Sequence, residues 1–567
     1  MLKHFNTTKI YFLAILIGAL IVRLYGINWD QGYHLHPDER AIVMFTTPLQ
    51  FPADVKAFFS PQSTWNPHFF AYGSFPMYFL KIISSGEALL NPIYAMYEGI
   101  NLVGRVLSVL FDIGTLITLF FLAKKLFNKT VALFAIFFYA TGVLPIQLSH
   151  FYAVDTPLTF FILLTLFTLI TFYEKPTFYK ALLVGILFGF SLATKTSALV
   201  LLMSIGVTIS ADFLLLFVKN IHRVSVWIPH ITPFFRKLLL EGVLIIAAVL
   251  ATFAILEPYA FIDFPEFWQQ NMQQAAMTKD AYTFPYTLQY VGKIPYFYEL
   301  KNVFLWGQGP FLAIFSFAGG LYFTYLAFKK EKKEKWAQEV ILVVFFWAYF
   351  LTVGKFAIGF MRYLLPLYPL LSLFAAVLFF RLLKFIPRKV EVLFIIAYLF
   401  LITIWPLSFI SIYHEQNTRV IASQWIRQHI SYGKTLAIEH WDDRLPLFDG
   451  EKYSFVELTL YDQPDDDAKW TVLNEKLKQA DYIIIASNRL YVPLQKMADC
   501  TVYERACYPK TAEYYKQLFN GSLGFEKVAE FSTVPVIPFL PYIINDQSAD
   551  ESFTVYDHPK VLIYKRR

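Results

Sequence analysis

Long runs of hydrophobic residues alternate with short polar segments over the first 410 or so residues of the chain. A membrane-spanning helix needs about 20 largely apolar residues. Eleven stretches meet or approach that length: 10–27, 103–122, 130–148, 156–173, 181–194, 196–218, 238–256, 304–327, 337–354, 363–380 and 390–412. The pattern therefore predicts an α-helical polytopic membrane protein.

The positions of Lys and Arg predict on which side of the membrane each loop lies, because cytoplasmic loops carry an excess of them. With the N-terminus inside and the stretch 181–218 divided at Lys195, the most basic loops all face the cytoplasm: 124–129, 175–180, 219–237, 329–335 and 381–389. A long first loop (28–102) and a second long loop (257–303) then lie outside.

The remainder of the chain has a different pattern. Helix-like and strand-like segments alternate after residue 413: 419–429, 435–439, 469–479, 482–486 and 560–564. This order predicts a small α/β fold. We therefore expect a transmembrane domain at 1–413 and an extracytoplasmic α/β domain at 414–567. In the second domain, Trp441-Asp442-Asp443 and Asp465-Asp466-Asp467 are expected in solvated loops, although acids beside Trp or Tyr could also hold a sugar.

Composition supports this division. The chain is 57% hydrophobic and 16% charged, which excludes an ordinary soluble protein. Its net charge of +7 comes from an excess of Lys and Arg in the first 413 residues. These residues are expected to orient the loops across the membrane, so no nucleic-acid partner is expected. The two cysteines, Cys500 and Cys507, lie in the C-terminal domain, and the sequence leaves open whether they form a disulfide or stay unpaired.

Ionisable residues gather at one predicted face of the membrane. Asp38 and Glu39 follow the first apolar stretch, and three cations stand at the ends of later stretches: Arg105, Lys195 and Arg362. Charged groups beside hydrocarbon are costly and usually functional. Simpler roles remain open, since acids also favour the start of a surface helix and cations also extend to lipid headgroups.

Several segments resemble, in order, the GT-C glycosyltransferases, and among these the protein mannosyltransferase and aminoarabinose transferase-like group. They are GRVLSVLFDIGTL, HFYAVDTPLTFF, ATKTSALVLL and FMRYLLPLYPLL, at 104–116, 150–161, 193–202 and 360–371. The resemblance covers roughly residues 10–410, and the tail is similar to those of bacterial members. It implies a polyprenyl-phosphate-linked sugar donor, inversion at the anomeric carbon and transfer at the outer face of a plasma membrane.

The resemblance also implies roles for single residues. A polyprenyl phosphate leaves without a general acid, so one carboxylate suffices to take the acceptor's proton. Asp38 matches the acidic motif of the family's first loop and is the expected general base, with Glu39 as the runner-up. Arg362 and Lys195, and next Arg105, are expected to hold the donor phosphate through charge-assisted contacts.

A second acidic site is expected around Asp155, with His150 and His36, where members of the family bind the acceptor or a divalent ion. No compact ligand spacing accompanies the histidines on this face, which are His34, His36, His68 and His150. No cofactor is therefore certain, and a divalent metal is left open.

Two other functional classes fit parts of the pattern. A transporter or lipid-linked sugar flippase would form no bond, but such proteins tend to place polar sites at the midplane, between internal repeats that this sequence lacks. A non-catalytic assembly protein would use its tail to bind envelope glycan. The sequence favours the glycosyltransferase, and leaves the sugar and the acceptor (protein, lipid or polysaccharide) undetermined.

Overall fold

The computed structural model describes residues 7–219, 222–329, 335–448 and 452–567. Its contacts divide the chain into two compact units. The membrane unit comprises Met1–Ile27, Pro37–Ala275 and Pro295–Pro406, and the sheet unit comprises Asn28–His36, Ala276–Ile294 and Leu407–Arg567. The domain limits expected from the sequence, 1–413 and 414–567, stay a prediction.

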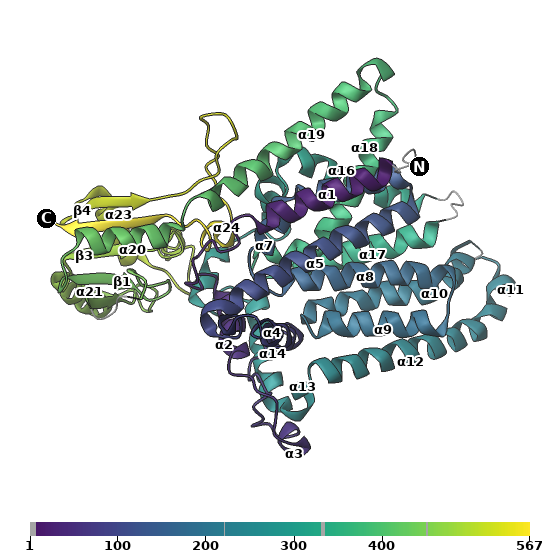
Figure 1. Cartoon of the computed structure of the whole chain (residues 1–567), viewed down its shortest axis with the longest axis horizontal. Coiled ribbons are helices and arrows are strands. Elements are labelled where there is room, and N and C mark those ends of the chain that lie inside the picture. Colours follow the sequence, from purple (N-terminus) through teal and green to yellow (C-terminus); the bar gives the residue numbers. More distant parts are fainter. Residues whose placement is uncertain (1–6, 220–221, 330–334, 449–451) are drawn as a thin grey trace. The chain divides into compact units, whose positions relative to one another are not determined.

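Within the described residues, nine helices are long and apolar enough to cross a membrane (Figure 1). They fall on α1 (Thr7–Leu24), α5 (Tyr97–Leu126), α8 (Asp155–Glu174), α10 (Leu201–Lys219), α12 (Ile231–Leu256), α16 (Pro310–Phe328), α17 (Trp336–Val353), α18 (Tyr368–Leu383) and α19 (Arg388–Ile410). A bent pair and one shorter apolar helix add to them: α6 (Lys129–Ala140) with α7 (Val143–Ser149), at 61°, and α9 (Phe178–Leu192). Each of the eleven predicted stretches overlaps one of these features, so the polytopic helical class is confirmed. Which loops face the cytoplasm stays a prediction.

Short helices fill the segments between the long ones. They are α2 (Pro37–Thr46), α3 (Val55–Phe58), α4 (Phe75–Glu87), η1 (Pro92–Ala95), η2 (Thr196–Val200), α11 (Val224–Trp227), η3 (Ile228–His230), α13 (Tyr259–Ile262), α14 (Phe264–Lys279), α15 (Phe297–Asn302), η5 (Val303–Gly307) and η6 (Met361–Leu367). The helix α2 begins at a proline and carries two acids in its first turn, both of which favour a helix start. Its Ile42 and Val43 pack in a buried cluster with Leu80 of α4 and Leu107 of α5. This packing fixes the orientation of the first turn of α2.

The sheet unit contains a five-stranded sheet in the order β2-β1-β3-β5-β4. Strands β1 to β3 are parallel, whereas β5 is antiparallel to both β3 and β4. The strands are β1 (Thr435–Glu439), β2 (Ser454–Leu458), β3 (Tyr482–Ile485), β4 (Phe525–Phe531) and β5 (Val561–Arg566). The helical segments of this unit are η4 (Pro285–Tyr290), η7 (Ser411–His414), α20 (Thr418–His429), α21 (Asp467–Gln479), α22 (Val492–Lys496), α23 (Pro509–Asn520) and α24 (Glu551–Thr554). The expected α/β character is confirmed.

The two cysteines of the sheet unit are joined. Cys500 and Cys507 form a disulfide, with their Cα atoms 5.1 Å apart. The alternative of unpaired thiols, which the sequence left open, is therefore removed. Structural disulfides are typical of proteins that fold in an oxidising compartment.

Candidate active site

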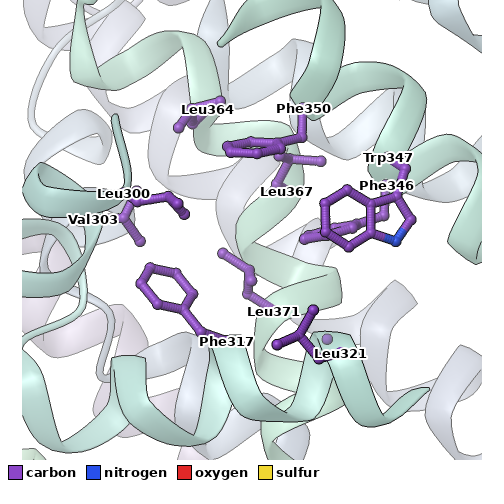
Figure 2. A pocket seen from close by; sticks show the side chains of 11 residues that line it. Leu300, Val303, Phe317, Leu321, Phe346, Trp347, Phe350, Leu364, Leu367 and Leu371 are labelled. Carbon is purple, nitrogen blue, oxygen red and sulfur yellow. The ribbon is translucent and has the colours of Figure 1, made fainter. Parts of the chain in front are cut away.

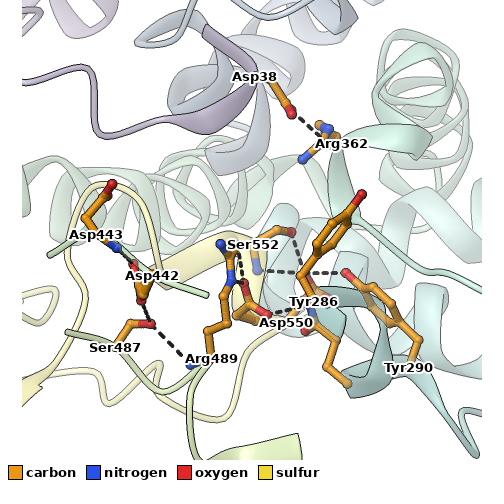
Figure 3. A network of polar contacts seen from close by, with 12 residues as sticks. Asp38, Tyr286, Tyr290, Arg362, Asp442, Asp443, Ser487, Arg489, Asp550 and Ser552 are labelled. Atoms are coloured by element: carbon orange, nitrogen blue, oxygen red, sulfur yellow. Dashed lines mark hydrogen bonds and ion pairs between the residues drawn. The ribbon is translucent and has the colours of Figure 1, made fainter. Parts of the chain in front are cut away.

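Asp38 and Arg362 are separated by most of the membrane unit's sequence, yet they form an ion pair. The Arg362 Nη2 atom lies 2.8 Å from the Asp38 Oδ2 atom (Figure 3). The side chain of Asp38 is 16% exposed and that of Arg362 is 9% exposed. The guanidinium of Arg362 also lies over the ring of Phe360, 4.5 Å from its centroid. Aromatic contact and the carboxylate together hold the cation in one place.

A second acid and a second cation join this pair. The Lys195 Nζ atom is 2.8 Å from Asp155 Oδ1, and Arg362 Nε is 3.7 Å from Asp155 Oδ2. Asp155 opens α8, whereas Lys195 stands in the break between α9 and η2. Lys195 Nζ lies 4.3 Å from the ring centroid of Tyr363, the residue after Arg362. Four charged side chains from four separate segments therefore form one continuous network of ion pairs.

Tyr72 is a member of this site that the sequence did not single out. Burial raises the pKa of its hydroxyl well above the ordinary value, and the neighbouring carboxylate of Asp38 raises the pKa further, with a hydrogen bond between the two side chains contributing. The hydroxyl therefore stays protonated and can donate to Asp38. The sequence gave no signal that Tyr72 contacts Asp38, because the loop in which it lies contains many aromatic residues.

Glu39 and Arg105 meet in a different arrangement. Two guanidinium nitrogens of Arg105 contact the two carboxylate oxygens of Glu39, at 2.6 and 2.9 Å, and both side chains are fully buried. The Tyr152 backbone N–H also donates to Glu39, at 2.8 Å. Arg105 further donates to the Ile27 carbonyl oxygen, at 2.9 Å. This bidentate pair ties α2 to α5 and to the end of the first span.

The histidines expected in the second acidic site have other surroundings. His150 is buried, and its two ring nitrogens lie 2.8 and 2.9 Å from the carbonyl oxygens of Ile146 and Tyr25. His36 belongs to the sheet unit, where its ring lies 4.2 Å from the ring of Tyr556. The structure thus places backbone oxygens and an aromatic ring beside the two histidines.

One group of side chains in the described residues has the spacing of a metal site. The ligand atoms of His68, Asp263 and Glu266 all lie within 4.8 Å of one another. His68 Nδ1 is 2.7 Å from Glu266 Oε2 and 3.8 Å from Asp263 Oδ2. The side-chain amide of Asn66 donates to Asp263 at 3.0 Å, and that of Gln270 donates to Glu266 at 3.1 Å. These hydrogen bonds fix the orientation of both carboxylates. An imidazole and two carboxylates suit zinc with one position left for water.

An apolar cavity of about 210 Å³ is lined in part by the helix η6, which also carries Arg362 (Figure 2). Leu364 and Leu367, on the same 3₁₀ helix as Arg362, line it. The remaining lining comes from α15, η5, α16, α17 and α18: Leu300, Val303, Phe317, Gly320, Leu321, Phe346, Trp347, Phe350 and Leu371. The helix η6 therefore carries Arg362, which can bind an anionic group, and, within the next five residues, two leucines that line the apolar cavity.

The sheet unit has a polar network of its own, which Figure 3 also draws. Beyond the end of β3, Arg489 pairs with Glu551, at 2.5 Å, and Gln289 donates to the same carboxylate, at 2.5 Å. Burial raises the pKa of Glu551 to about 7, although Arg489 opposes the shift. Burial likewise raises the pKa of Glu439, the last residue of β1, to about 8. These groups join segments of the sheet unit that are distant in sequence.

Comparisons with known proteins agree with this architecture. The sequence model of the family described as dolichyl-phosphate-mannose-protein mannosyltransferase matches residues 93–255. A search of curated proteins finds no match. Among solved structures, AglB, an oligosaccharyltransferase of Archaeoglobus fulgidus in complex with an inhibitory peptide and a dolichol-phosphate, has 13% identity and a TM-score of 0.50, over 99% of this chain and 89% of that chain.

ArnT of Cupriavidus metallidurans, bound to undecaprenyl phosphate, is 12% identical with a TM-score of 0.47, over 87% of this chain and 95% of that chain. The likeness to AglB shows that the chain has the GT-C fold. Together with the family match, this fold indicates a multi-pass membrane glycosyltransferase.

Proposed function

We propose that this GT-C-fold membrane protein transfers a sugar from a polyprenyl phosphate to an acceptor at the outer face of the membrane, with inversion and with Asp38 as the general base. The observation that carries the proposal is the network of Asp38, Arg362, Asp155 and Lys195, together with an apolar cavity lined by the helix that carries Arg362. Sugar transfer from a lipid phosphate needs one proton acceptor, phosphate-binding cations and a space for the lipid.

The donor is bound by the two cations that the structure brings together. Arg362 and Lys195 hold the phosphate, and the first isoprene units of the carrier occupy the cavity lined by Leu364 and Leu367. Arg362 suits a phosphate because its planar guanidinium forms two parallel hydrogen bonds. The dolichol-phosphate in the AglB complex supports this class of donor. Arg105 is not part of the proposed phosphate site, because Glu39 and a carbonyl oxygen occupy its guanidinium.

In the transfer step, the acceptor oxygen attacks the anomeric carbon while Asp38 takes the proton from that oxygen. The bond between the anomeric carbon and the phosphate oxygen breaks, and its electron pair leaves with the polyprenyl phosphate. Tyr72, which stays protonated, donates a hydrogen bond to Asp38 and orients the carboxylate. Asp155, between the two cations, positions both of them. The acceptor is a protein, a lipid or a polysaccharide.

The disulfide and the charge distribution support the proposed orientation. The disulfide Cys500–Cys507 favours an oxidising compartment for the sheet unit. The basic loops favour a cytoplasmic N-terminus and an extracytoplasmic C-terminal domain in a bacterial plasma membrane. The active site then lies on the non-cytosolic face.

The test compares Asp38→Asn with Glu98→Gln, an exposed acid in the first turn of α5, in proteoliposomes. Lipid-linked sugars extracted from the native membrane serve as donors, and mass spectrometry measures sugar transfer to envelope acceptors. We expect Asp38→Asn to abolish transfer while undecaprenyl phosphate still binds, and Glu98→Gln to leave both unchanged. Full transfer by Asp38→Asn would overturn the assignment of the base. Movement of labelled donor across the membrane without bond formation would favour a flippase.

A further inference from the structure

The segment between β4 and α24 is an uncharged hydrophobic stretch within the sheet unit. Residues 532–545 read STVPVIPFLPYIIN and contain no acidic, basic or histidine side chain. Prolines at 535, 538 and 541 restrict the backbone throughout it. Such a stretch is unusual in a part of the chain whose acids outnumber its bases.

This stretch forms a hairpin, which Figure 1 shows as the yellow loop that extends beyond the sheet. Val536 and Ile543 pair as an antiparallel bridge. The Ile537 N–H donates to the Tyr542 carbonyl oxygen at 2.9 Å, and the Ile544 N–H donates to Pro535 at 2.8 Å. These bonds satisfy part of the backbone internally, which lowers the cost of moving the hairpin from water into an apolar phase.

The tip of the hairpin exposes large hydrophobic side chains. Phe539 is completely exposed, and Leu540, Tyr542 and Ile543 are each more than half exposed. Phe539 also has a φ of 62°, in the left-handed region that a side chain rarely adopts. A contiguous group of exposed apolar side chains marks a surface that contacts a protein or a membrane.

The base of the hairpin contacts the end of a helix that is apolar enough to span the membrane. The Val536 N–H donates to the Ser411 Oγ atom at 2.9 Å. Ser411 is the first residue after α19, one of the helices apolar enough to span the membrane. The hairpin is therefore attached directly after the last turn of that helix. Aromatic residues such as Phe539 and Tyr542 are favoured at the interface of a bilayer.

We propose that residues 535–544 form a membrane anchor, whose tip inserts into the lipid interface of the leaflet in which α19 ends. The occupant is lipid, because the tip has no charge with which to select a protein partner and is attached to the end of a span. The anchor shortens the range of motion of the sheet unit relative to the bilayer surface. It does not depend on the proposed sugar transfer.

The two native cysteines are bonded to each other, so an introduced cysteine is the single free thiol of the full-length protein. Phe539→Cys places a thiol at the tip, and Val472→Cys places one at an exposed apolar position of α21 as the matched control. Each variant is labelled with nitrobenzoxadiazole in nanodiscs of phosphatidylethanolamine and phosphatidylglycerol.

We expect the label at residue 539 to emit at shorter wavelength than the label at 472, and to lose intensity when spin-labelled lipids are included. The label at 472 should keep its emission. Leu540→Cys gives a second tip position in case Phe539→Cys folds poorly. Aqueous emission without quenching at both tip positions would overturn the proposal and leave a protein partner as the alternative occupant.

Discussion

Replacing Arg105 by methionine tests whether its pair with Glu39 holds the fold or serves the reaction. The pair is fully buried, and its two contacts of 2.6 and 2.9 Å use both oxygens of the carboxylate. Removing one partner of a buried ion pair costs about 3–5 kcal/mol, because the other charge is left without compensation. In Arg105→Met, Glu39 retains the N–H of Tyr152 as a hydrogen-bond donor.

A double variant separates the free energy of the ion pair from the cost of leaving Glu39 buried without its partner. Combining Arg105→Met with Glu39→Gln removes both charges, so most of the about 3–5 kcal/mol lost in the single variant should return. The interaction free energy from the double-mutant cycle then measures the pair itself. Lys175→Met, which removes an exposed cation at the end of α8, is the matched control and should leave stability unchanged.

The assay is thermal unfolding in detergent, run beside the binding of undecaprenyl phosphate. We expect Arg105→Met to melt at a lower temperature than the native protein and the double variant to recover most of the difference. The reasoning would be refuted if Arg105→Met melted normally and lost only the binding of undecaprenyl phosphate. Arg105 would then contact the donor, as the sequence first suggested.

Two further predictions concern stability. Burial lowers the pKa of His558, but the charges of Asp557 and Asp546 and the hydrogen bonds to both outweigh this effect and raise the pKa to about 10. The stabilising effect of His558 is therefore full below pH 6.5 and is lost between pH 6.5 and 10. We expect His558→Gln to flatten the decrease in melting temperature over that range, and a curve unchanged from the native protein would contradict this. For the group His68, Asp263 and Glu266, zinc should raise the melting temperature of the native protein, and His68→Ala should abolish both this effect and zinc retention measured by mass spectrometry. Equal zinc content in the two proteins would exclude the site.

The sequence predicted the membrane helices well because lipid requires long apolar runs, and such runs are visible without tertiary information. The break at Lys195 was expected from the charges of the loops, and α9 ends at Leu192 while η2 starts at Thr196. The number of spans depended on recognising that break. The bend between α6 and α7 was not expected, although Thr141 and Gly142 interrupt the apolar run there and Pro145 follows.

The individual partners of charged residues were harder to predict. Asp38 and Glu39 are adjacent in the sequence, but consecutive side chains on a helix point about 100° apart because it has 3.6 residues per turn. They therefore meet different arginines, Arg362 and Arg105. Which arginine each acid meets depends on how α2 packs, and that packing involves residues from α4 and α5.

The acids of the C-terminal region show the same limit. The groups 441–443 and 465–467 were expected in solvated loops. Yet the Asp442 side chain is 3% exposed and contacts Arg419, and the Asp465 side chain is 1% exposed and contacts Lys469. The sequence around an acid shows that burying its charge would be unfavourable, but it does not show the cation that pairs with the acid in the fold and offsets that cost.

The ion pair between Asp38 and Arg362 has a consequence for the proposed reaction. A carboxylate that shares a guanidinium is a weaker proton acceptor than a free carboxylate, so Asp38 is restrained while the donor is absent. The phosphate of the donor is a diester with one negative charge, as a carboxylate has, and its two free oxygens compete for the same nitrogens of Arg362. In the proposed reaction, a bound phosphate would share the nitrogens of Arg362, and Asp38 would then be available to the acceptor. Base strength and donor occupancy are thereby coupled through one arginine, which would restrict deprotonation of the acceptor to the complex that holds a sugar to transfer.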